Sequence, residues 1–276
     1  MLYLILAILS NCTMTFMIKL SNKYKGSFYN INIFNYLFGG GLAYLITPKH
    51  NIFSFEINNI FLMFFALINA LFYIVCLTLM QINVQKNGAP LSIMYNRIGL
   101  IIPILISIIF FRENPSIFQI IGIILALFSI YYLNRDKNKI SNFLYLILLF
   151  LAGGIVDTIA KVYSIFGEVS LYSTFIFYTF FFSFILSLII GRKKFSQINK
   201  NEILFGALIG VFNQLSTIFQ LKAIGILPSY VIFPTYSICI ILIVSIINYL
   251  VFKEKLFKEQ YIGMGVILIA LLFLNL

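Results

Sequence analysis

Residues 60–82 read IFLMFFALINALFYIVCLTLMQI, and this stretch decides the class of fold. It contains no Asp, Glu, Lys or Arg, and it exceeds the roughly 20 apolar residues that a helix needs to cross the hydrocarbon core of a bilayer. Apolar and polar residues do not alternate along it, as they would in a strand of a membrane barrel. The stretch therefore predicts a transmembrane helix.

The rest of the chain has the same character. Of its 276 residues, 62% are apolar and 10% are charged, whereas soluble domains are about 45–50% apolar and about 25% charged. This composition excludes a soluble globular protein, a disordered chain and a coiled coil. Nine further apolar runs are predicted membrane helices, at 2–20, 28–46, 89–111, 117–133, 143–160, 171–190, 203–221, 230–252 and 260–275. We interpret the first as a retained span rather than a signal peptide, because no basic residue precedes it.

The two halves of the sequence repeat each other. The matches occur in one order and at nearly one offset, between 138 and 142 residues, which predicts an internal repeat. They include Leu2–Leu6 with Leu144–Leu148, Ala66–Ile68 with Ala207–Ile209, Phe111–Glu113 with Phe252–Glu254, and Gln119–Gly122 with Gln260–Gly263.

This repeat predicts the organisation of the whole chain: a five-helix repeat over 1–134, a basic linker over 135–142, and a second five-helix repeat over 143–276. Because five is odd, the second repeat enters the membrane from the opposite side. The predicted fold is thus an all-α integral membrane protein with ten transmembrane helices as two inverted five-helix repeats. Inverted repeats are the usual architecture of secondary transporters.

The ending of each half resembles a known family. Glu113 is followed by Gln119-x-x-Gly122, and Glu254 by Gln260-x-x-Gly263. Two five-helix halves with this ending resemble the EamA-type branch of the drug/metabolite transporter superfamily, over essentially the whole chain. The resemblance implies a ten-helix carrier with a central cavity lined mainly by the first, third and fourth helices of each half. It also implies a substrate among amino acids, other small metabolites and drugs.

The net charge of +11 is carried by basic residues at the ends of apolar runs. That placement is typical of membrane anchoring rather than of nucleic-acid binding. With the N-terminus outside, 14 basic residues face the cytoplasm: Lys19, Lys23, Lys25, Lys86, Arg135, Lys137, Lys139, Arg192, Lys193, Lys194, Lys200, Lys253, Lys255 and Lys258. The other side then carries Lys49, Arg112, Lys161 and Lys222. The positive-inside rule therefore favours both termini outside, whereas the resemblance implies both termini in the cytoplasm.

Two charged residues lie deep inside predicted spans. An ionisable group at this depth costs a few kcal/mol on insertion scales and marks a candidate functional site. Arg97 is about 12 Å along the fourth span, where it could bind a carboxylate or phosphate or could hold the bundle together. Asp157 is about 21 Å along the sixth span, where it could bind an ammonium, carry a coupling proton, or pair with Lys161 one turn away. We interpret Lys19 and Lys161 as anchors that extend toward the membrane surface.

Neutral polar residues accompany these charges in the helices that the resemblance assigns to the cavity. Each alone is more often a helix–helix hydrogen bond than a ligand contact. Tyr73 and Gln214 are equivalent at an offset of 141, which favours a shared site. The predicted substrate-binding residues are Arg97, Asp157, Asn11, Asn69, Tyr73, Tyr95, Asn96, Asn213, Gln214, Tyr230 and Tyr236.

Motifs of enzymes, metal sites and ATP-driven pumps were not found. There is no HExxH motif and no glycine-rich phosphate loop, and His50 is the single histidine. We therefore expect neither enzymatic activity nor a bound metal or cofactor.

The sequence predicts a multi-pass protein of the cell (inner) membrane that moves a small polar metabolite, such as an amino acid, by alternating access. Its expected partners are that substrate, the lipid bilayer and a coupling proton. The competing hypotheses are a lipid flippase, an exporter of drug-like or quaternary-amine compounds, and a structural membrane subunit.

Overall fold

In the computed structural model, residues 1–24, 26–52, 57–110, 115–133, 143–191, 198–224, 229–253, 257–274 and 276 are described. Within these ranges the chain is helical and contains no strand. The long helices are α1 (Leu2–Lys23), α2 (Phe28–Ile46), α4 (Ile57–Asn87), α5 (Ala89–Ile98), α6 (Ile101–Phe110), α7 (Ile117–Leu133), α8 (Phe143–Phe166), α9 (Tyr172–Gly191), α10 (Lys200–Ile224), α11 (Ser229–Phe252) and α12 (Lys258–Leu274). Two short helical segments are α3 (Lys49–Ile52) and η1 (Val169–Leu171).

The predicted membrane fold class is confirmed. Seven segments of the described chain are long and apolar enough to cross a membrane, and a shorter apolar helix covers Ile117–Ser129. Apolar side chains are also exposed along the helices, as in Phe64, Ile124 and Leu272, which suits contact with lipid. The ten-span count stays a prediction, because α2 and α12 fall outside those segments.

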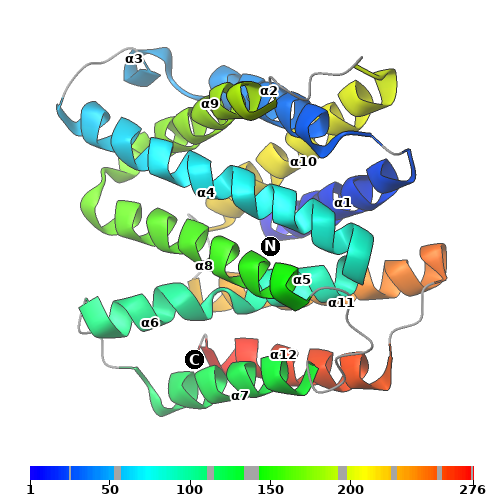
Figure 1. Cartoon of the computed structure of the whole chain (residues 1–276). Coiled ribbons are helices and arrows are strands. Elements are labelled where there is room, and N and C mark those ends of the chain that lie inside the picture. Colours follow the sequence, from blue (N-terminus) through cyan, green and yellow to red (C-terminus); the bar gives the residue numbers. More distant parts are fainter. Residues whose placement is uncertain are drawn as a thin grey trace.

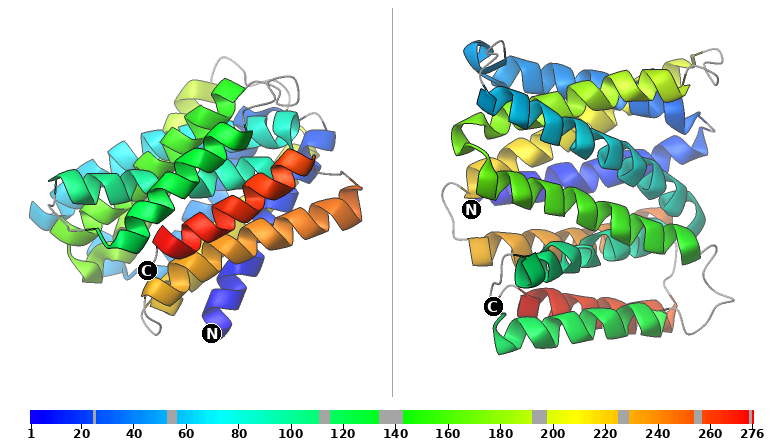
Figure 2. Two further views of the ribbon diagram at one scale, coloured as in Figure 1. Left: turned by 90° about the horizontal axis from the view of Figure 1, so that it is seen from below. Right: turned by 60° about the vertical axis from the view of Figure 1, so that its left-hand side comes forward.

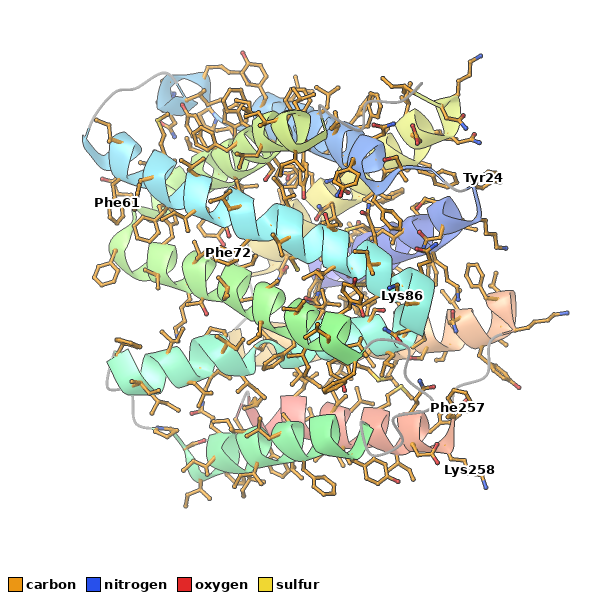
Figure 3. The ribbon with its side chains drawn as sticks, viewed as in Figure 1. Tyr24, Phe61, Phe72, Lys86, Phe257 and Lys258 are labelled. Atoms are coloured by element: carbon orange, nitrogen blue, oxygen red, sulfur yellow. The ribbon has the colours of Figure 1, made fainter. Side chains whose placement is uncertain are left out.

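The helices run side by side between two ends of the bundle (Figures 1 and 2). Both termini lie at one of these ends, as the right-hand view of Figure 2 shows, and we call it the terminal end. Tyr24, Lys86 and Lys258 lie at the opposite end (Figure 3), which we call the basic end. The predicted basic linker, 135–142, lies outside the described residues, as do Glu113 and Glu254.

The fourth predicted span, 89–111, is not one continuous helix, which corrects the prediction. It divides at Gly99 and Leu100 into α5 and α6. The division places Pro103 in the first turn of α6, where the missing N–H of proline costs no helical hydrogen bond. Close contact with α8 also requires a glycine at the break. A Cβ atom on Gly99 would lie 2.9 Å from the backbone oxygen of Phe150 and 3.0 Å from the backbone nitrogen of Gly154.

The helix contacts follow a symmetric pattern. The first helix of the first half, α1, packs on α10 of the second half. Correspondingly, the first helix of the second half, α8, packs on α4 of the first half. The pairs α10 with α2 and α4 with α9 correspond in the same way, while α2 with α9 and α7 with α12 join equivalent helices. The pair of α7 and α12 lies at one edge of the bundle (Figure 1). This pattern leaves α1, α4, α5, α8, α10 and α11 around the middle.

Glycines on α10 allow the closest of these packings. A Cβ atom on Gly210 would lie 2.2 Å from the backbone oxygen of Asn35, and one on Gly206 would lie 2.7 Å from that of Ile31. Only a residue without a side chain lets α2 and α10 approach so closely, as small residues generally do between membrane helices. The two predicted halves are therefore in direct backbone contact.

Lys19 is not an anchor at the membrane surface, which corrects a second prediction. Its side chain is buried, its Nζ donates a hydrogen bond to Asn248 Oδ1, and it lies 4.2 Å from the ring centroid of Phe252. Because Asn248 and Phe252 belong to α11, these contacts join α1 to α11 near the basic end. Burial is possible because the amide oxygen and the aromatic ring replace water around the ammonium.

Candidate functional site

A cavity of about 180 Å³ lies in the middle of the bundle. Six helices supply its walls: α1, α4, α5, α8, α10 and α11. In chain order these are the first, third and fourth predicted spans of each half, as the resemblance implies. The lining residues are Asn11, Met14, Thr15, Tyr73, Cys76, Leu77, Met80, Ile93, Asn96, Arg97, Gly153, Val156, Asp157, Asn213, Ser216, Thr217, Gln220 and Tyr236.

Arg97 is held in the cavity wall by the break in the fourth span. It lies in the last turn of α5, where the unpaired carbonyl groups of a helix end favour a cation. Its Nη2 donates a hydrogen bond of 3.4 Å to Asn11 Oδ1, and its guanidinium carbon lies 5.0 Å from the ring centroid of Tyr236. Its Nε is buried and has no hydrogen-bond partner among the described residues. A donor in this condition is available to an anionic ligand.

A directed chain of hydrogen bonds orients the acceptor of Arg97. Asn11 Nδ2 donates to Tyr236 Oη at 3.0 Å, and Tyr236 Oη lies 2.8 Å from Ser216 Oγ. Ser216 Oγ in turn donates to the backbone oxygen of Ala7 at 3.1 Å. Because that bond uses the serine proton, the Tyr236 hydroxyl is the donor to Ser216. The chain therefore turns the amide oxygen of Asn11 toward the guanidinium.

Asp157 lines the same cavity from α8. The charge of Arg97 acts electrostatically on this carboxylate, whereas Lys161 is not among the cavity residues. One opposite charge thus comes from each predicted half. Counted by helix rise, the two Cα atoms differ in depth by about 9 Å, but the long side chain of Arg97 narrows this gap by reaching Asn11 and Tyr236.

Two further contacts cross the site. Tyr73 Oη donates a hydrogen bond of 3.0 Å to Asn213 Oδ1, which joins α4 to α10. Cys76 Sγ lies 3.8 Å from Asn96 Oδ1. A Cβ atom on Gly153 would lie 2.3 Å from Asn96 Oδ1, so this amide occupies space that any other residue at 153 would fill.

Of the predicted binding residues, seven line the cavity: Asn11, Tyr73, Asn96, Arg97, Asp157, Asn213 and Tyr236. Three others lie elsewhere: Asn69 Nδ2 donates to Thr179 Oγ1 of α9, Tyr95 is fully buried and packs edge-on to Phe143, and Gln214 is buried beside Asn213. Helix geometry explains Tyr95 and Gln214, because at about 100° per residue each points outside the arc of its helix that faces the cavity. The side chain of Tyr230 lies outside the described residues.

The sequence analysis missed most of the apolar and hydroxyl lining. These residues follow a signal that was present, because they lie three, four or seven positions from a predicted one on the same helix. Met14 and Thr15 follow Asn11, Leu77 and Met80 follow Tyr73, and Ser216 follows Asn213. No group of three His, Cys, Asp or Glu side chains that could hold a metal occurs in the described ranges.

Comparison with known proteins relates the chain to a transporter family. Residues 1–135 match the model of the EamA-like transporter family. The first half of this chain is therefore similar to the EamA-like transporter family. A protein of Haemophilus influenzae, named only as uncharacterized, is 25% identical to this chain over an alignment that covers 94% of this chain and 92% of that protein. The match and the long apolar helices support a multi-pass membrane protein of the transporter class.

Proposed function

We propose that this EamA-like protein is a secondary transporter that moves a small zwitterionic metabolite, such as an amino acid, across the cell membrane by alternating access. Arg97 binds the carboxylate of the substrate, and Asp157 binds its ammonium. The observation that carries this proposal is the presence of one Arg and one Asp, from different halves of the chain, in the wall of a single cavity. Charges at this depth are costly, and a zwitterion compensates both.

The size of the cavity supports a small substrate. Pockets for drug-sized ligands measure about 300–1,000 Å³, and this one measures about 180 Å³. An exporter of large drugs or a flippase that accepts whole lipid headgroups needs more room. Asn11 also orients the guanidinium of Arg97 for paired hydrogen bonds to a carboxylate, which a cationic substrate cannot accept.

Alternating access is supported by the relation between the two halves. The most extensive helix contacts between the two halves keep their pattern when the helices of one half are exchanged for those of the other. The family match also ends within one residue of the predicted end of the first repeat. Two inverted repeats around a site near the middle of the membrane can open that site first to one face and then to the other.

The test is uptake of labelled amino acids into proteoliposomes that contain the purified protein, with and without a proton gradient. Arg97→Gln should abolish uptake and leave the protein folded. Asp157→Asn should do the same, and any remaining transport should lose its dependence on the proton gradient. Lys49→Gln removes a charge outside the cavity and is the matched control, with uptake as in the wild type. Wild-type uptake in both cavity variants would contradict the proposal.

A further inference from the structure

The cavity has two chemically different ends, and this difference bears on what the substrate carries besides its charges. The inference rests on the proposed function, since it concerns the side chain of the zwitterion. Depth along each helix can be counted from the basic end, where α1, α4 and α11 end and α5, α8 and α10 begin (Figures 1 and 3).

Most of the apolar lining gathers on the side of the basic end, and Val156, beside Asp157, is the exception. At 1.5 Å per residue, Ile93 lies about 6 Å from the end of its helix, Met80 about 10 Å, Met14 about 14 Å and Leu77 about 15 Å. These four residues come from α1, α4 and α5, so they surround this side from three helices. Two of them are methionines, whose flexible thioether side chains adapt to an apolar ligand.

The polar lining gathers on the side of the terminal end. By the same count Asn213 lies about 20 Å deep, Asp157 about 21 Å, Tyr236 about 24 Å and Gln220 about 30 Å. The Cα atom of Arg97 lies at only about 12 Å. Its guanidinium nevertheless belongs to this polar side, because it contacts Asn11 and Tyr236.

The polar residues among the apolar ones already have partners. Thr15 Oγ1 donates to the backbone oxygen of Asn11 at 3.0 Å, and Asn96 Oδ1 lies 3.8 Å from Cys76 Sγ. A charged group that packs against Met14, Leu77, Met80 and Ile93 would lose its water and find no opposite charge among these four side chains. Such burial is strongly unfavourable.

We infer that the substrate is a zwitterion with an apolar or thioether side chain and no second charge, and that Met14, Leu77, Met80 and Ile93 select it. Its charged groups face the terminal end, where Arg97 and Asp157 bind them. Its side chain extends toward the basic end. One methylene group in an apolar pocket changes the discrimination between two substrates by roughly 10–200-fold. The affinity should therefore depend strongly on the length of the substrate's side chain.

Calorimetric binding to the purified protein tests this inference, with glycine, L-norleucine, L-methionine, L-lysine and L-glutamate as probes. Norleucine and methionine should bind at least about tenfold more tightly than glycine, and lysine and glutamate more weakly than norleucine. Met80→Gln keeps the length of the side chain but makes it polar, and it should remove most of the preference for norleucine over glycine. Met63→Gln, on the same helix but outside the cavity, is the matched control and should bind norleucine as the wild type does.

The outcomes separate the inference from the proposed function. If the zwitterions bind and lysine or glutamate binds as tightly as norleucine, the side-chain inference is wrong and the zwitterion site stands. An equal effect of Met80→Gln and Met63→Gln on norleucine also overturns the inference. If none of the five probes binds, and Arg97→Gln transports whatever the wild type transports, both are wrong.

Discussion

The fourth spans of the two halves are built differently. In the first half the span divides into α5 and α6 at Gly99 and Leu100, and Arg97 occupies the helix end so formed. In the second half α11 runs unbroken from Ser229 to Phe252 and presents the ring and hydroxyl of Tyr236 to the same cavity. The two helices have corresponding neighbours in the bundle, and the break in one of them places a cation on one side only.

The contact with α8 accounts for this difference. Gly99 and Gly154 face each other so closely that a Cβ atom on Gly154 would lie 2.6 Å from the backbone oxygen of Gly99. The approach of two backbones leaves no room for a side chain on either helix. Asp157 follows one turn after Gly154 and lines the same cavity as Arg97. The break and the two charged residues are therefore linked through the contact between α5 and α8.

The largest expected effect comes from the cation at the break. Arg97→Gln should lower affinity for a zwitterion by at least about 100-fold, because each hydrogen bond to a charged group is worth about 1.5–3 kcal/mol. Arg97→Lys keeps the charge but loses the planar pair of donors, so it should restore only part of the binding. Calorimetric titration of both variants measures this order. Equal binding by the Gln and Lys variants would show that charge at this position plays no part.

The break itself should be sensitive to a single methyl group. Gly154→Ala forces a Cβ atom against Gly99 and Ile102, and overpacking of this kind costs about 1–3 kcal/mol. We expect the unfolding temperature to fall by several degrees in a thermal melt. Gly265→Ala on α12 is the control, because a Cβ atom there meets nothing within 4 Å. An equal melting temperature for the two variants would remove the steric explanation of the break.

The unbroken helix should contribute less. Tyr236→Phe keeps the ring beside Arg97 and removes the hydroxyl that links Asn11 to Ser216. Leaving a buried partner unsatisfied costs at least about 1 kcal/mol, so zwitterion affinity should fall by at least about 5-fold through loss of the orientation of Asn11. The titration used for Arg97 measures it. An unchanged affinity would mean that Asn11 holds its position without Tyr236.

The smallest effect is expected at the contact between α4 and α10. Tyr73→Phe removes one hydrogen bond, to Asn213, which is typically worth about 0.5–1.5 kcal/mol. Because neither residue contacts Arg97 in a hydrogen bond that the structure describes, the variant should lower thermal stability slightly and change affinity less than Tyr236→Phe does. A larger loss of affinity for Tyr73→Phe than for Tyr236→Phe would reverse the comparison between the two halves.

The sequence alone predicted the helices and both charged residues of the cavity wall. Length and apolar composition identify membrane helices in a sequence, and a charged residue such as Arg97 or Asp157 is rare within them. The break at Gly99 was not predictable, because it depends on the approach of Gly154 from a distant part of the chain. Lys19 was misread for a related reason, since its partner Asn248 lies 229 residues away.

The most direct test compares one ligand with and without its ammonium. L-norleucine and hexanoate differ by that group, which the account assigns to Asp157. Calorimetric titration of wild type and Asp157→Asn with both ligands should show a loss of at least about tenfold for norleucine and no loss for hexanoate. The account is contradicted if Asp157→Asn binds norleucine as tightly as the wild type does, or if both ligands lose affinity equally.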